Sequence, residues 1–382
     1  YIHQTIIDGS YESTCILIDE YESVHICGFT VTHGSGVPGH LPEGEVGGGI
    51  FFRNNSVSTL ENCIVTENKV TGWGGGVSGG DDTVYMKGVV IKNNQAYLWG
   101  GGLWASRTGK LLSFEFDSIN RCSIFSNYSG RGCDIYKTFT YDTLHLYLDT
   151  FSVMQPDIYH IWESDSLGHQ GLVMDIDILN AKIETVAADL YVSPAGDNNN
   201  SGLTVSEPLQ TIAYALSKIE ADADNIRTIH LSNGLYSEAS NNEKFPINLR
   251  SYVNLAGEDK NSTILDADSL CLVMNGNKET KQYTISNLTL QKGYGSEARG
   301  AGILLLGLNK NTTFEDLTIK DGSNWFKSAL NTGSSTETYF RNVDIFNNKR
   351  GAKAIGLGSG NDPVMGLETD TVTFENSLIY DN

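Results

Sequence analysis

Two adjacent carboxylates and one arginine have spacings that could serve cleavage of an acidic polysaccharide. Asp81 and Asp82 lie four and five residues after Val77, and Arg107 lies four residues after Leu103. A uronate lyase needs a cation or arginine to neutralise the substrate carboxylate, and a lysine or arginine to remove the adjacent proton. The alternative is a surface ion pair between Asp81 and Arg107, which contributes at most about 1 kcal/mol. We favour the ion pair and assign no catalytic residue.

Aromatic residues form a second chemical feature. Trp73 and Trp99 each precede three glycines and are 26 residues apart. Tyr97 and Trp104 lie nearby in the sequence. Exposed aromatic rings hold sugars by apolar contact, and such patches often mark binding sites. We therefore predict carbohydrate-binding residues Trp73, Trp99, Tyr97 and Trp104, with packing of the rings on one another or under a loop as the alternative.

The sequence gives weaker indications of metal binding and of cysteine reactivity than of the two features above. The segment 197–202 offers several oxygen ligands in a turn, as calcium loops do, but it lacks the alternation and terminal glutamate of an EF-hand. We favour a plain turn rich in Asp and Asn, with Ca²⁺ as the alternative. The eight histidines show no metal-ligand spacing, and Cys63 and Cys122 occupy inward positions typical of small core residues. No resident metal or cofactor is predicted.

A repeated apolar pattern must position all of these residues. Each copy has an apolar anchor, an aliphatic residue five positions later, and a Gly or Asn eight positions later. Because Gly and Asn enter left-handed backbone at least cost, we expect the chain to turn a corner at that eighth position. The anchors are Ile26, Leu60, Met86, Ile119, Ile285, Phe314, Phe340 and Phe374.

The repeat predicts an all-β parallel β-helix. Apolar residues alternate within each copy, which indicates short strands with one buried face. Each strand then pairs with its equivalent one coil on, about 4.8 Å away, so that equivalent side chains stack into ladders. Asparagine amides in such a ladder can hydrogen-bond to one another. By this register Trp73 neighbours Trp99, and Asp81 neighbours Arg107.

The copies fall into two sets of four, which predicts two tandem β-helices. Residues 1–140 form the C-terminal part of the first, and residues 141–188 form a strand-rich cap and connector. Residues 189–382 form the second, truncated at its C-terminal end. A capping helix is predicted near residues 207–219, with Ser206 as its N-cap and Pro208 in its first turn. The chain is expected to be an excerpt of a longer multidomain protein.

One segment resembles a known group. Residues 190–197 (LYVSPAGD), 207–212 (EPLQTI) and 233–236 (NGLY) resemble bacterial secreted right-handed β-helix proteins of the pectin-lyase-like superfamily. The resemblance is to the branch with an N-terminal domain of unknown function. It implies right-handed helices and an extracellular or cell-surface location, but not lyase activity, since this superfamily includes lyases, hydrolases, adhesins and inert stalks.

The amino-acid composition limits the classes of partner that the protein can bind. The net charge of −20 argues against nucleic acid, and no apolar stretch is long enough for membrane insertion. The Asn-Thr-Asp, Gly-His-Gly and Arg-Ile-Lys motifs of polygalacturonases are absent. We therefore predict a secreted or surface scaffold of adhesin type that contacts a polysaccharide or surface glycan. The alternative is a polysaccharide lyase or glycoside hydrolase.

Overall fold

The protein is all-β and is built from parallel coils, as predicted. The computed structural model describes residues 5–19, 23–39, 44–53, 56–80, 82–106, 113–138, 144–164, 174–276, 280–295, 301–306, 310–324, 328–331, 336–349, 355–356 and 372–382. The chain divides into two compact units, Tyr1–Glu184 and Thr185–Asn382. The second boundary of the predicted connector, residue 188, lies close to this division.

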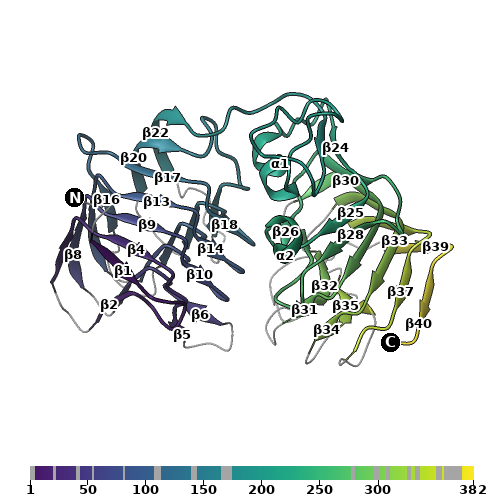
Figure 1. The fold of residues 1–382 in the computed structure, drawn as a ribbon, viewed down its shortest axis with the longest axis horizontal. Coiled ribbons are helices and arrows are strands. Elements are labelled where there is room, and N and C mark those ends of the chain that lie inside the picture. The colour runs from purple at the N-terminus through teal and green to yellow at the C-terminus, as the bar shows by residue number, and fades with distance from the viewer. Residues whose placement is uncertain are drawn as a thin grey trace. The chain divides into compact units, whose positions relative to one another are not determined.

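Strands of the N-terminal unit run side by side in successive coils (Figure 1). One sheet contains, in order, β1 (Ile6–Asp8), β4 (Thr30–Thr32), β9 (Ile64–Thr66), β13 (Val90–Lys92), β17 (Cys122–Phe125), β20 (Leu144–Phe151) and β22 (Met174–Ala181). A second contains β2 (Ile16–Ile18), β7 (Ile50–Arg53), β11 (Val77–Gly80), β15 (Leu103–Ser106), β19 (Ile135–Thr138) and β21 (Ile161–Ser164).

Smaller sheets complete this unit. One contains β16 (Ser113–Phe116), β12 (Thr83–Lys87), β8 (Val57–Glu61) and β3 (His25–Cys27). Another contains β10 (Lys69–Val70), β14 (Gln95–Ala96) and β18 (Tyr128–Ser129), and an antiparallel pair contains β5 (Val37–Pro38) and β6 (Glu45–Val46). The residues predicted as a cap contribute β20, β21 and β22, which extend the larger sheets in parallel.

The C-terminal unit has one large parallel sheet. It contains β23 (Leu190–Val192), β24 (Arg227–Leu231), β25 (Gly234–Tyr236), β27 (Val253–Gly257), β28 (Thr263–Asp266), β30 (Lys281–Gln291), β33 (Lys310–Lys320), β36 (Thr336–Arg341), β37 (Asp344–Phe346), β39 (Val372–Glu375) and β40 (Leu378–Tyr380). A second sheet contains β26 (Ile247–Asn248), β29 (Met274–Gly276), β32 (Ala301–Leu306), β35 (Ser328–Asn331) and β38 (Ile355–Gly356). A third sheet pairs β31 (Tyr294–Gly295) with β34 (Ser323–Asn324).

The core is made of ladders, in which residues at the same position of successive coils stack on one another. Five residues after the anchors, Val31, Val65, Ile91 and Ile124 pair from coil to coil and are fully buried. In the C-terminal unit the anchor phenylalanines stack, with ring centroids 5.0 Å apart for Phe314–Phe340 and 4.7 Å apart for Phe340–Phe374. Cys63 and Cys122 are buried in the core of the N-terminal unit, as predicted.

One predicted anchor is wrong. Ile119 is 88% exposed, and the residue that pairs with Met86 is Phe116. The pattern resumes at Ile124, which pairs with Ile91. Residues 117–120 form a turn instead, in which the Asp117 carboxylate accepts hydrogen bonds from the N–H groups of Ile119 and Asn120. An insertion between the two strands therefore moves the anchor to an earlier residue than predicted. The residues after the insertion keep the predicted register.

The corner also lies one residue earlier than expected. Positive φ occurs seven residues after each predicted anchor, at His33, Glu67, Asn93, Ser126, Lys292, Asp321, Asn347 and Asp381. The eighth residue does not adopt it. A second left-handed corner, two residues after the anchor, is occupied by Gly28, Asn62, Gly88, Asn287, Asp316, Asn342 and Asn376.

At Gly28 the free-energy cost of left-handed backbone at this second corner can be measured without any steric clash. Its φ is 83°, and an added Cβ would meet no atom within 4 Å. Gly28→Ala should therefore destabilise the N-terminal unit by about 1 kcal/mol through backbone strain alone, and Gly28→Asn by less. Urea denaturation of both variants checks this. Equal stability of the two variants would show that left-handed backbone is not what selects the residue here.

The eighth-position asparagines form a buried chain of hydrogen bonds, as predicted. Asn68 donates to Oδ1 of Asn94 (2.9 Å), Asn94 to Oδ1 of Asn127 (3.0 Å), and Asn127 to Oδ1 of Asp134 (3.0 Å). The glycine runs lie beside this chain. A Cβ on Gly76 would lie 2.6 Å from the Gly102 carbonyl oxygen and 2.9 Å from Nδ2 of Asn94, so no side chain fits there.

The capping helix starts later than predicted. Helix α1 spans Ile212–Lys218, and its N-cap is Thr211, not Ser206. The earlier residues are extended because Leu209 exchanges backbone hydrogen bonds with β23, donating to the Tyr191 carbonyl (2.8 Å) and accepting from the Ser193 N–H (2.9 Å). The predicted apolar face is buried, including Ile212, Leu216 and Ile219. A second short helix, α2, spans Glu238–Asn241.

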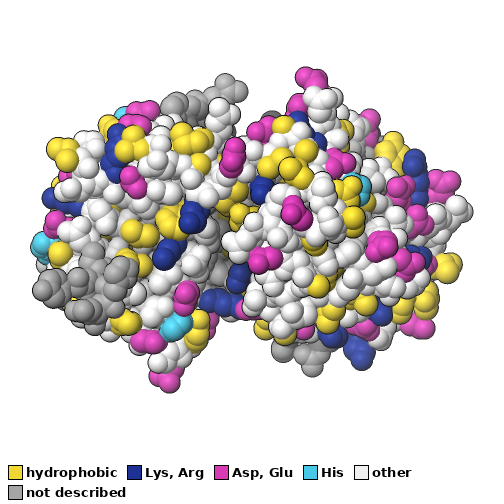
Figure 2. Space-filling view, turned by 45° about the horizontal axis from the view of Figure 1, so that its top comes forward, with side chains coloured by type: hydrophobic (Ala, Val, Ile, Leu, Met, Phe, Trp, Pro, Cys, Tyr) yellow, Lys and Arg dark blue, Asp and Glu magenta, His cyan; other side chains and the backbone are white. Residues whose placement is uncertain are grey.

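Neither described helix is long and apolar enough to cross a membrane. Acidic side chains are scattered over the visible surface and do not gather in one patch (Figure 2).

Candidate functional site

The predicted aromatic residues form a stack that runs from coil to coil. Trp73 pairs with Trp99 in a parallel bridge, and their rings lie 5.3 Å apart at 21°. Trp99 stacks in turn on Tyr136, at 5.2 Å and 11°. Trp104 lies 5.7 Å from Trp73 at 34°. The assignment of Trp99 as the neighbour of Trp73 is therefore confirmed, and Tyr136, the register partner of Trp104, extends the group.

Stacking limits what this group can present to a ligand. Trp73 and Tyr97 are each only 8% exposed, whereas Trp99 and Trp104 are half-buried. Sugars bind the faces of aromatic rings, and here neighbouring rings cover faces while contributing about 0.5–1.5 kcal/mol per pair. The ring area that remains for a ligand belongs to Trp99 and Trp104.

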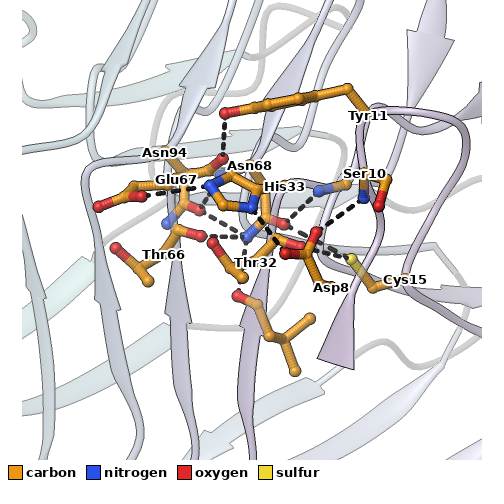
Figure 3. A network of polar contacts seen from close by, with 12 residues as sticks. Asp8, Ser10, Tyr11, Cys15, Thr32, His33, Thr66, Glu67, Asn68 and Asn94 are labelled. Carbon is orange, nitrogen blue, oxygen red and sulfur yellow. Dashed lines mark hydrogen bonds and ion pairs between the residues drawn. The ribbon is translucent and has the colours of Figure 1, made fainter. Parts of the chain in front are cut away.

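A polar cluster links three successive coils of the same unit (Figure 3). Nδ1 of His33 lies 3.1 Å from Oδ2 of Asp8, and Nε2 lies 3.4 Å from Oε2 of Glu67. The Tyr11 ring lies 5.0 Å from the His33 ring, and its hydroxyl donates to the Glu67 carbonyl (3.4 Å). We name Asp8, Tyr11, His33 and Glu67 the His33 cluster.

The electrostatics of the His33 cluster do not favour acid or nucleophilic catalysis. Hydrogen bonds from the Ser10 N–H and from His33 lower the pKa of Asp8, so this carboxyl stays ionised and cannot protonate a leaving group. Cys15 lies close by, but burial raises the pKa of its thiol to about 11. A thiol that remains protonated is a poor nucleophile. The cluster therefore links the coils.

A second cluster was missed by the sequence analysis. Ligand atoms of His25, Cys27 and Glu61 all lie within 4.8 Å of one another. The expectation from histidine spacing considered positions along the sequence only, whereas this group combines residues of two adjacent coils. The repeat held the signal: Cys27 and Glu61 each follow an anchor directly, at Ile26 and Leu60.

Lys292 is paired with a carboxylate. The Lys292 ammonium lies 2.7 Å from Oδ2 of Asp266, and this hydrogen bond, with the charges of Asp268 and Asp321, raises its pKa. A lyase base needs the opposite shift, because it must be deprotonated to accept a proton. Asp81 and Arg107, the pair considered for uronate cleavage, lie outside the described residues.

Oxygens of the segment 197–202 already accept hydrogen bonds within the protein. Oδ1 of Asp197 accepts from the N–H (2.9 Å) and the side-chain amide (2.8 Å) of Asn199. Oδ1 of Asn198 accepts from the N–H groups of Gln210 (2.9 Å) and Thr211 (3.2 Å). The segment is thus a turn stabilised by Asp and Asn side chains, which also holds the start of α1.

Comparison with known proteins gives one family. A family model described as "Protein of unknown function (DUF1565)" matches residues 194–358, which lie within the C-terminal unit and cover fewer than half of the residues. The chain matches none of the curated proteins with which it was compared. The family match and the parallel coils together fit a β-helix protein, and they assign no activity.

Proposed function

We propose that this chain is a secreted or cell-surface β-helix scaffold of adhesin type, as found among bacterial pectin-lyase-like proteins, and part of a longer multidomain protein. The proposal rests on the contacts that the polar and aromatic side chains make between coils. In the described coils the asparagine ladder, the His33 cluster and the aromatic stack all connect one coil to the next. Contacts between neighbouring coils stabilise a long stack of coils, which is what an extended scaffold requires.

Contact with a polysaccharide or surface glycan is proposed at Trp99 and Trp104. Both rings are half-buried and so keep some area for apolar contact with a sugar. Because Trp99 stacks on Trp73 and on Tyr136, the area that it offers is the edge of its ring. The net charge of −20 favours a neutral or cationic glycan over an anionic one.

Two assays test this function. A glycan array should show binding, and Trp99→Ala and Trp104→Ala should each weaken it about tenfold, a loss of roughly 1.4 kcal/mol. Tyr85→Ala is the matched control, because Tyr85 is an exposed aromatic residue on another sheet (β12) of the same unit. An array that stays blank, or that responds equally to all three variants, would contradict glycan contact at this stack.

Incubation with uronate polysaccharides and calcium tests the scaffold assignment itself. A scaffold should leave the ultraviolet absorbance unchanged. Unsaturated product would instead show that the chain is a lyase, and reducing sugar released without such product would show a hydrolase.

A further inference from the structure

Strand register brings three metal-binding side chains to one outward face of the N-terminal unit. Cys27 of β3 lies directly opposite Glu61 of β8. His25 lies two residues before Cys27, so both side chains point to the same face of the sheet. His25 and Cys27 are exposed, and Glu61 is half-buried, so the three are open to solvent.

The atoms are close enough for one ion to bind all three. Nε2 of His25 lies 2.9 Å from Oε2 of Glu61, and all three ligand atoms lie within 4.8 Å of one another. A tetrahedral zinc with bonds of about 2.0–2.3 Å holds its ligand atoms about 3.3–3.8 Å apart. Small side-chain rotations convert one arrangement into the other. We propose that His25, Cys27 and Glu61 bind a zinc ion whose fourth position is open.

The donor set favours zinc over calcium and magnesium. Calcium and magnesium prefer oxygen ligands throughout, whereas an imidazole, a thiolate and a carboxylate together suit Zn²⁺. On binding, the Cys27 sulfur–zinc bond forms as the thiol proton leaves to solvent, and no oxidation or reduction occurs. Zinc binding at this site is independent of the scaffold function.

The competing explanation is a simple ion pair between His25 and Glu61. The same unit offers a matched comparison, because Nδ1 of His145 lies 3.1 Å from Oδ2 of Asp175 across two neighbouring strands. Both residues of this second pair are exposed, and no cysteine belongs to it. A zinc site should depend on the first group alone.

Cobalt and zinc titrations of the reduced full chain test the site. Co²⁺ should produce the absorption bands of a tetrahedral ion and a thiolate charge-transfer band, and Zn²⁺ should abolish both. Zn²⁺ should also slow alkylation of Cys27. His25→Ala, Cys27→Ser and Glu61→Gln should each weaken zinc binding about tenfold or more.

The controls are His145→Ala and Cys15→Ser, which should leave the spectra and the zinc affinity unchanged. All substituted residues other than Cys15 and Glu61 are exposed, and circular dichroism verifies that each variant is folded. Absence of the thiolate band, or equal loss of binding in His145→Ala, would overturn the proposal and indicate non-specific binding to an acidic surface.

Discussion

Replacing Asn94 by alanine should lower the free energy of unfolding of the N-terminal unit by about 4 kcal/mol. The Asn94 amide donates to the carbonyls of Val65 (2.9 Å) and Lys92 (3.0 Å) and to Oδ1 of Asn127 (3.0 Å). Its own Oδ1 accepts from the N–H (3.1 Å) and side-chain amide (2.9 Å) of Asn68. Alanine would take one hydrogen bond from each of these buried groups, although Oδ1 of Asn127 keeps the backbone N–H of Asn94 (3.0 Å). Each group left without a partner costs about 1–3 kcal/mol before water or relaxation compensates. Urea denaturation followed by tryptophan fluorescence measures the loss.

Two further variants separate the hydrogen bonds from simple loss of volume. Asn94→Asp keeps the size and the acceptors but removes both side-chain N–H donors, and it should be at least as unstable as Asn94→Ala. Asn93→Gly alters the neighbouring exposed asparagine while preserving its left-handed backbone (φ 55°), and it should be almost neutral. A stable Asn94→Asp variant would contradict the importance of the donated bonds.

The repeat predicted neighbours well because stacking makes sequence position and spatial position equivalent. Once Trp73 and Trp99 occupied the same position in successive copies, a parallel coil had to place them about 4.8 Å apart along the axis. The same reasoning placed the asparagine ladder and the buried Cys63. These predictions needed only the register, and the register is strongly constrained wherever one face of a strand is buried.

Predictions failed where an interaction competes with the pattern. Ile119 fits the apolar spacing, but Asp117 captures the N–H groups of Ile119 and Asn120 in a turn. Ser206 is a good N-cap by type, yet the hydrogen bonds of Leu209 with β23 keep the chain extended up to Thr211. The cluster of His25, Cys27 and Glu61 needed the register to be applied to outward-facing residues as well as to the core.

A buried carboxyl completes the start of α1 from a distant part of the sequence. Glu243 is fully buried, and its two oxygens accept from the N–H groups of Ile212 (2.7 Å), Ala213 (3.0 Å) and Lys244 (3.1 Å). The first N–H groups of a helix have no partner within the helix, so Glu243 satisfies two of them. Glu243→Ala should therefore destabilise the C-terminal unit by about 3 kcal/mol at pH 5 and accelerate hydrogen exchange at Ile212 and Ala213.

Stability should also depend on pH through this carboxyl. Burial raises the pKa of Glu243 from 4.5 to about 7, although the three N–H groups act in the opposite direction. Between these two values the folded state binds more protons than the unfolded state, so stability falls as pH rises. The contribution of Glu243 is complete below about pH 4.5, and about 3 kcal/mol is lost once the pH exceeds about 7.

Glu243→Gln tests this pH dependence directly, because glutamine keeps one acceptor and cannot ionise. Denaturation and α1 hydrogen exchange between pH 4.5 and 8 should show a decline in the wild-type C-terminal unit and a flatter profile in Glu243→Gln. Glu258→Gln alters an exposed glutamate of the same unit and should retain the wild-type slope. If Glu243→Gln also keeps that slope, the titrating group is not Glu243. In that case its carboxyl stays ionised in the folded protein, and the charge is stabilised by the N–H groups at the start of α1.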